Sequence, residues 1–183
     1  MIESQKSMAN RSKQFLGPVL WAAFIFATSS GVVTTRQLSG AVAKVSGPLH
    51  VSQSGFEEVW KAVWWIFVKG WHATEFAVLA WLLLRALTPK PNALRNSAIA
   101  AGTYALFDEL HQVYVVGRGG RMSDVMIDWI GIGVFALLWH CTWPRDRKVL
   151  VFTLAVVAIF LLSILPTPTF PLPGAPESNR FNP

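Results

Sequence analysis

The segment from Val149 to Leu165 contains no charged residue, and it constrains the fold of this chain more than any other feature. A helix needs about 20 mostly apolar residues to cross the hydrocarbon core of a membrane. Four further apolar segments of similar length precede it. We therefore predict an all-α fold, a polytopic transmembrane helical bundle of about five spans. The predicted spans lie near residues 15–33, 63–87, 97–116, 124–143 and 149–165.

The composition agrees with a membrane protein. Hydrophobic residues make up 52% of the chain and charged residues 14%, whereas a soluble domain has roughly 25% charged residues. This excludes a disordered chain and argues against an ordinary soluble one. The net charge of +6 would suggest nucleic acid as the partner of a soluble protein. No soluble basic domain is present here, so we expect membrane lipids as partners and no nucleic acid.

Lys and Arg residues near the span ends predict the orientation, because cytoplasmic loops carry an excess of them. They gather in the N-terminal arm and in the loops after the second and fourth spans, which fall on one side if there are five spans. We therefore expect a cytoplasmic arm at 1–14, a transmembrane domain at 15–165, and an extracytoplasmic Pro-rich tail at 166–183, extended or disordered. Phe56 to Trp60 are expected to form a short interfacial helix, in a loop long enough to cover the outer side. The first apolar segment also fits a signal peptide, but four further spans make the protein multi-pass in either case.

Ionisable and polar residues interrupt three of the spans. Such residues are costly within a membrane and are functional candidates by default. Their helical spacing places most of them on one face of each span, with Glu109 turned about a quarter turn away from that face. Because the spans alternate in direction, they reach a similar depth on the outer side, where Ser29 and Ser30 end the first span. The candidates are Lys69, His72 and Glu75 in the second span, Asp108, Glu109, His111 and Gln112 in the third, Arg118 and Arg121 in the following Gly-rich loop, and Asp124 and Asp128 in the fourth.

Structural interpretations of these residues stay open at this stage. His72 and Glu75 fit a buried hydrogen-bonded pair with no further role. Asp124 fits a carboxylate that stabilises the N-terminus of a helix. Arg118 and Arg121 fit a salt-bridged cap over Asp124 and Glu109. Gly131 and Gly133 fit close packing between helices.

Five motifs in this order resemble those of the VanZ-like family of bacterial integral membrane proteins. They cover roughly residues 18–135, and two positions depart from the common pattern: Phe76 replaces Tyr, and Val116 replaces Pro. The matching segments are Ala23–Ser30 (IFxxSS), Lys69–Phe76 (KxxHxxEY), Tyr104–Gln112 (YxxxDExHQ), Val115–Arg118 (fxpGR) and Asp124–Gly131 (DvxxDxxG). The resemblance implies a multi-pass protein of the bacterial cell membrane. It also implies a link to glycopeptide resistance, since the founding member is associated with low-level resistance to teicoplanin.

Two classes of function fit the polar residues. In the first, a membrane enzyme works at the outer leaflet, with His72, Glu75, Asp108, His111 and Asp128 as candidate catalytic residues. The binding residues are then Lys69, Glu109, Gln112, Arg118, Arg121, Asp124 and Ser30. The expected ligand is an anionic envelope lipid or cell-wall precursor, because an Arg guanidinium suits phosphate.

The second class is a non-catalytic binding or accessory protein that uses the same residues, and a proton-coupled carrier is a further alternative. The candidate catalytic set also offers nitrogen and oxygen donors for a divalent metal. A His and a Glu three positions apart are a weak metal signal, so the sequence assigns no metal ligand, and the cofactor stays unknown.

Overall fold

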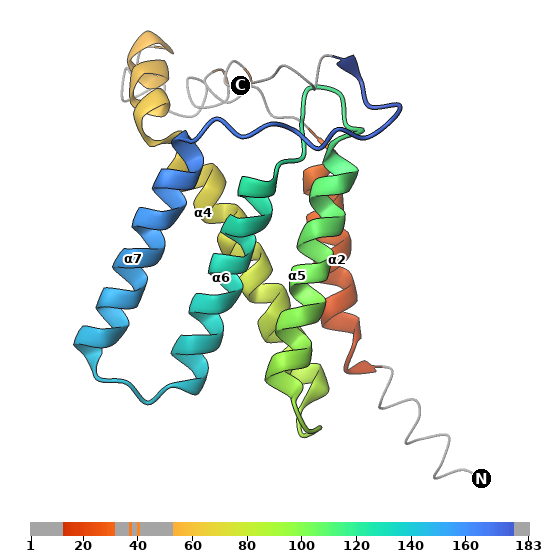
Figure 1. The fold of residues 1–183 in the computed structure, drawn as a ribbon, viewed down its shortest axis with the longest axis vertical. Helices are drawn as coiled ribbons and strands as arrows, with labels where there is room; N and C mark the ends of the chain where they lie inside the picture. Colours follow the sequence, from red (N-terminus) through yellow and green to blue (C-terminus); the bar gives the residue numbers. More distant parts are fainter. Residues whose placement is uncertain (1–12, 32–36, 38–39, 41–52, 178–183) are drawn as a thin grey trace.

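The computed structural model describes residues 13–31, 37, 40 and 53–177. These residues form five helices and no β-strand, which confirms the predicted all-α class (Figure 1). The helices are α2 (Leu16–Ser29), α4 (Gln53–Leu87), α5 (Ala93–Gln112), α6 (Met122–His140) and α7 (Arg145–Ile164). The predicted arm at 1–14 and the end of the tail lie mostly outside the described residues, as does most of the predicted covering loop.

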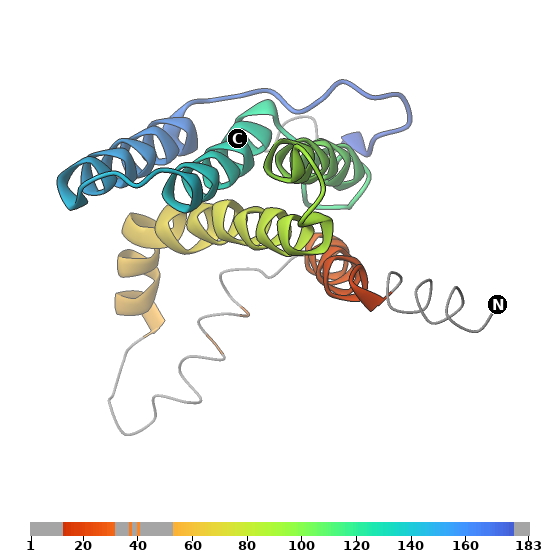
Figure 2. The same ribbon diagram turned by 90° about the horizontal axis from the view of Figure 1, so that it is seen from below.

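The helices run alternately up and down (Figure 1). Helices α2, α5 and α7 point one way, and α4 and α6 point the other. Seen from below, α5, α6 and α7 lie in a row, α4 crosses that row on one side, and α2 lies next to α4 (Figure 2). The end of α2, the end of α5 and the start of α6 therefore meet at one end of the bundle.

Three of the helices have the length and apolar composition of a membrane span: α4 from Ser54 to Leu87, α6 and α7. Helix α2 is apolar but shorter. Helix α5 has 20 residues, enough for a rise of about 30 Å, yet it is more polar than the others. Its buried residues explain this, because they are Ser, Ala and Gly together with Asp108, Glu109 and Gln112. These small and polar residues pack against protein on one side of the helix, while Ile99, Leu106 and Phe107 are exposed on the other.

Two helix ends differ from the predicted spans. Helix α2 ends at Ser29, where the hydroxyl groups of Thr28 and Ser30 donate to carbonyls of the preceding turn. The Ser30 N–H closes the last turn on the Phe26 carbonyl. Phe56 to Trp60 are helical as expected, but they do not form a short helix of their own, because α4 begins at Gln53 and includes them. The first turns of α4, drawn in gold, bend away from the rest of the helix (Figure 2).

The apolar core lies among α2, α4, α5 and α6. Its fully buried members include Ile25, Phe76, Leu79 and Ile132. A Cβ atom at Gly131 would overlap the backbone of Ala73, so α4 and α6 touch through their main chains at this point. Helix α7 has no buried residue and packs on the outside of this core.

The Pro-rich tail is extended in its described part, but it is also held in place. It runs back across one end of the bundle, drawn in blue (Figure 1). Thr169 forms an antiparallel bridge with Arg121, and the Phe170 N–H donates to the Gly120 carbonyl at 2.9 Å. The hydroxyls of Ser123 and Thr167 lie 2.8 Å apart. The tail therefore packs against the loop between α5 and α6, a contact that the sequence analysis did not predict.

Candidate functional site

The predicted polar residues meet at the end of the bundle where α2 and α5 end and α6 begins. Every one of them lies in the described part of the chain. Helix α5 is packed against both α4 and α6, so its neighbouring residues Asp108 and Glu109 are both fully buried, at 1% and 0% exposure. The sequence analysis gave this helix a single inward face and turned Glu109 partly away from it.

One group of residues forms a continuous hydrogen-bonded chain: Ser29, Asp108, Gln112 and Arg118. The Ser29 hydroxyl donates to Asp108 Oδ1 at 2.6 Å, and Gln112 Nε2 donates to Asp108 Oδ2 at 2.8 Å. Arg118 Nη1 then donates to Gln112 Oε1 at 3.1 Å. Both oxygens of Asp108 accept a hydrogen bond, so this carboxylate links α2 to α5. We call these four residues the hydrogen-bonded chain.

A second group lies at the accessible edge of the site and consists of Ser30, His111 and Arg118, which we call the rim. Ser30 Oγ and His111 Nε2 are 3.1 Å apart, and the His111 ring stacks on Phe26 with 4.4 Å between centroids. The hydrogen bonds of Arg118 go to the Gly31 carbonyl at 2.8 Å, to the Thr28 carbonyl at 3.3 Å and to Gln112. All three acceptors are uncharged, so the guanidinium retains a positive charge at an accessible position.

The third group is buried and consists of His72, Glu75, Glu109 and Asp128, which we call the acidic centre. His72 Nδ1 lies 3.4 Å from Glu75 Oε1 and 3.8 Å from Asp128 Oδ1. Donor atoms of His72, Glu109 and Asp128 all lie within 4.8 Å of one another. Among the described residues, His72 Nδ1, Glu75 Oε2 and both oxygens of Asp128 have no hydrogen-bond partner.

Lys69 and Asp124 form an ion pair beside the centre, with 2.7 Å between Lys69 Nζ and Asp124 Oδ1. The sequence analysis considered Arg118 and Arg121 as a salt-bridged cap over Asp124 and Glu109; in the structure Lys69 pairs with Asp124, and Arg121 contacts Glu109 through its main chain. There the Arg121 N–H donates to Glu109 Oε2 at 3.0 Å, while Gln112 Nε2 donates to Glu109 Oε1 at 2.8 Å. Glu109 is thus held on both oxygens.

The structure gives Ser29 and Glu109 closer roles in the site than the sequence analysis did, and it adds two residues of the tail. Ser29, next to the predicted Ser30, carries the hydrogen bond to Asp108. Glu109 belongs to the acidic centre, although it is predicted only as a binding residue. Thr167 and Thr169 of the tail contact the loop and the start of α6 beside the site. The doubled Ser in Ala23–Ser30 is the one sequence signal for the first of these; the tail carries none.

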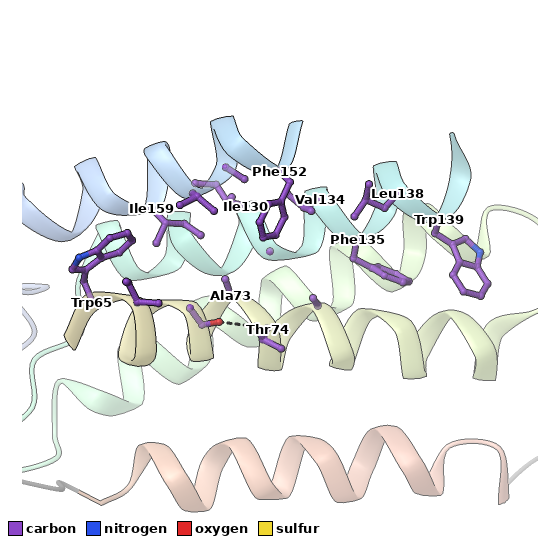
Figure 3. A pocket seen from close by; sticks show the side chains of 16 residues that line it. Trp65, Ala73, Thr74, Ile130, Val134, Phe135, Leu138, Trp139, Phe152 and Ile159 are labelled. Carbon is purple, nitrogen blue, oxygen red and sulfur yellow. Dashed lines mark hydrogen bonds between the residues drawn. The ribbon is translucent and has the colours of Figure 1, made fainter. Parts of the chain in front are cut away.

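A pocket of about 620 Å³ lies elsewhere, among α4, α6 and α7 (Figure 3). Trp65 and Trp139 stand at its two ends, and Phe135, Phe152 and Ile159 line it between them. The hydroxyl of Thr74 bonds back to the Gly70 carbonyl at 2.7 Å, so it is already occupied. The pocket is apolar and includes none of the predicted site residues.

Comparison with known proteins gives the family. A sequence model described as VanZ/LLP1 matches residues 15–143, which include every predicted site residue but exclude α7 and the tail. The chain is also similar to the uncharacterized membrane protein YwnJ of Bacillus subtilis (strain 168). The two are 32% identical over 77 residues, covering 42% of this chain and 51% of that protein, so the chain spans about half the length of this curated relative. No solved structure matches the chain significantly. With the apolar helices and the order of the motifs, the match over residues 15–143 shows that this chain belongs to the VanZ/LLP1 family of membrane proteins.

Proposed function

We propose that this protein binds the anionic head group of an envelope lipid or lipid-linked cell-wall precursor at an outward-facing site in the bacterial cell membrane. The rim carries this proposal. Arg118 is half-buried at the mouth of the site, and within the described residues its hydrogen bonds go to uncharged acceptors. A phosphate placed there gains charge-assisted hydrogen bonds without first displacing a carboxylate from an ion pair.

His111 and Ser30 are the other groups that meet such a ligand. His111 Nε2 lies 3.1 Å from the Ser30 hydroxyl, so the imidazole is within reach of a proton on a group bound at the same place. In the catalytic form of the proposal, His111 exchanges that proton, and Asp108 positions its neighbours through Ser29 and Gln112. We also propose that binding at this site underlies the family's link to teicoplanin resistance.

A non-catalytic accessory role is the second candidate, and the hydrogen-bonded chain favours it. Both oxygens of Asp108 are engaged by side chains from two helices. A carboxylate in that position holds helices together, and it does so whether or not a ligand reacts. The two candidates differ in whether His111 is needed for turnover or only for affinity.

The orientation is part of the proposal: the arm at 1–14 in the cytoplasm, and the tail at 166–183 outside. A reporter that works only in the cytoplasm should then be active when fused after Leu87. A reporter that works only outside the cell should be active when fused after Pro183. The opposite result at Leu87 would turn the rim toward the cytoplasm and would contradict binding to an outer-leaflet ligand.

Lipid retention tests the binding itself. The purified protein is exchanged into detergent with phosphatidylglycerol or, separately, phosphatidylcholine, and bound lipid is counted by native mass spectrometry. We expect preference for the anionic lipid and an affinity about tenfold lower in Arg118→Gln, since a charge-assisted hydrogen bond contributes about 1.5–3 kcal/mol. His111→Ala tests the rim without removing the bonds of Arg118. Arg95→Gln, an exposed site on the first turns of α5, is the control.

Equal retention of the two lipids, or equal loss in Arg118→Gln and Arg95→Gln, would contradict the proposal. Lipid and wall-precursor profiles of a deletion strain complemented with the same variants separate the two candidates. If His111→Ala accumulates in the membrane and binds lipid but leaves the deletion profile uncorrected, the site is catalytic. If it corrects the profile, and teicoplanin sensitivity with it, the role is accessory.

A further inference from the structure

We propose that the acidic centre is a binding site for a divalent transition-metal cation such as Zn²⁺ or Mn²⁺, with His72, Glu109 and Asp128 as ligands. Their donor atoms come from three different helices, α4, α5 and α6, and all lie within 4.8 Å of one another. A tetrahedral ion with bonds of about 2.0–2.2 Å holds its ligands roughly 3.4 Å apart. Small side-chain movements bring these three groups to that separation.

The unpartnered atoms point to a ligand rather than to a structural network. Asp128 is 0% exposed, and both of its oxygens lack a hydrogen-bond partner in the described part of the chain. His72 Nδ1 and Glu75 Oε2 are in the same condition. Buried polar groups are nearly always hydrogen-bonded, so these atoms require an explanation. A cation held by His72, Glu109 and Asp128 supplies a partner to His72 Nδ1 and to the Asp128 carboxylate.

The charges nearby favour a cation too. Lys69, one turn before His72 on α4, is already paired with Asp124 at 2.7 Å. Among the described residues, the ion pairs of Glu75 and Asp128 involve only His72. Carboxylates buried at membrane depth without a counter-charge are unstable unless they are protonated or bind a metal. One divalent ion offsets most of this charge.

The surroundings of Glu109 resemble the outer shell of a metal site. Gln112 donates to one of its oxygens and the Arg121 N–H to the other, which fixes the orientation of the carboxylate and leaves lone pairs directed to the centre. Gly120 is required for this approach, because a Cβ atom there would overlap the Glu109 carbonyl. The mixture of one imidazole and carboxylates favours Zn²⁺ or Mn²⁺ over Ca²⁺, which prefers oxygen ligands alone.

The metal content of the purified full-length chain tests this inference. A tag without histidine is used, the protein is stripped with chelator, and Zn²⁺ or Mn²⁺ is added back and counted by mass spectrometry. We expect about one ion per chain and a rise in the thermal midpoint that chelator reverses. Asp128→Asn and His72→Gln should each weaken binding by more than about tenfold, the loss that even an outer-shell change causes.

Two matched controls make the same chemical changes elsewhere: Asp146→Asn in the exposed first turn of α7, and His140→Gln at the end of α6. Both should bind metal as the unaltered chain does. If the Asp128 and His72 variants fail to fold, the midpoint of the unaltered chain with and without Zn²⁺ decides the matter. No bound ion, no shift of that midpoint, or equal binding by variants and controls would overturn the inference. The inference does not depend on lipid binding, since none of these measurements involves lipid.

Discussion

The hydrogen-bonded chain and the acidic centre lie side by side, but their carboxylates differ in whether they have hydrogen-bond partners. In the hydrogen-bonded chain, the two oxygens of Asp108 accept hydrogen bonds from Ser29 and Gln112. In the centre, neither oxygen of Asp128 has a partner within the described residues. Both aspartates are fully buried, so solvent does not account for the difference.

The contrast separates stability from function. A satisfied buried carboxylate stabilises the helices that it joins, and losing it leaves its donors without a partner. An unsatisfied buried carboxylate destabilises the fold, and a protein that keeps one does so for another purpose. We therefore expect substitutions in the hydrogen-bonded chain to lower the stability of the protein. Isosteric substitutions in the acidic centre should alter ligand binding instead.

Gln112→Ala should have the largest effect on stability. Gln112 donates to Asp108 and Glu109 and accepts from Arg118, and hydrogen bonds to charged groups contribute about 1.5–3 kcal/mol each. We expect a loss of about 3 kcal/mol or more in the free energy of unfolding, measured by titration with denaturing detergent. A loss of unfolding free energy below about 1 kcal/mol would contradict the expectation that the hydrogen-bonded chain, unlike the acidic centre, stabilises the fold.

Gly131→Ala should come next, and it acts on the contact between α4 and α6 that holds the acidic centre together. The added methyl overlaps the backbone of Ala73 and pushes α4 away from α6, which separates His72 from Asp128. Overpacking of this kind costs about 1–3 kcal/mol. Gly133→Ala is the control, since nothing lies within 4 Å of a Cβ atom there. Equal midpoints for the two variants would show that α4 and α6 are not in main-chain contact.

Ser29→Ala should have the smallest effect of the three. It removes one donor to Asp108, for about 1–2 kcal/mol, while the exposed Ser30→Ala should change the free energy of unfolding by less than about 0.5 kcal/mol. Thermal midpoints of the pair in one detergent provide the measurement. A larger loss in Ser30→Ala than in Ser29→Ala would show that Ser30, and not Ser29, is the serine bonded to Asp108.

Much of the fold was accessible from the sequence, because apolar length alone predicts helices near the observed ones. The spacing of Lys69, His72 and Glu75 also predicts that they share a face, and His72 and Glu75 do meet. Glu109 was misplaced because helical spacing says which residues share a face but not how many neighbours a helix has. The contact of α5 with both α4 and α6 buries adjacent residues that spacing assigns to different directions.

Two further features could not be predicted from the sequence: the contact of the tail with the loop between α5 and α6, and which of two serines bonds to Asp108. The contact of Thr169 with Arg121 joins main chains, so it leaves no pattern of side-chain types. Ser29 and Ser30 are chemically identical, and only the rotation of α2 against α5 decides which hydroxyl reaches Asp108. Both outcomes depend on tertiary packing.

The same substitution made in the two regions tests the central claim most directly. Asp108→Asn and Asp128→Asn each remove one buried charge and keep the shape of the side chain. Their thermal midpoints are compared in the presence of chelator, so that no bound metal contributes. We predict that Asp108→Asn lowers the midpoint, because the amide cannot accept from both Ser29 and Gln112, whereas Asp128→Asn leaves it unchanged or raises it. A fall in Asp128→Asn as large as that in Asp108→Asn would show that the acidic centre is a structural network and would contradict the account.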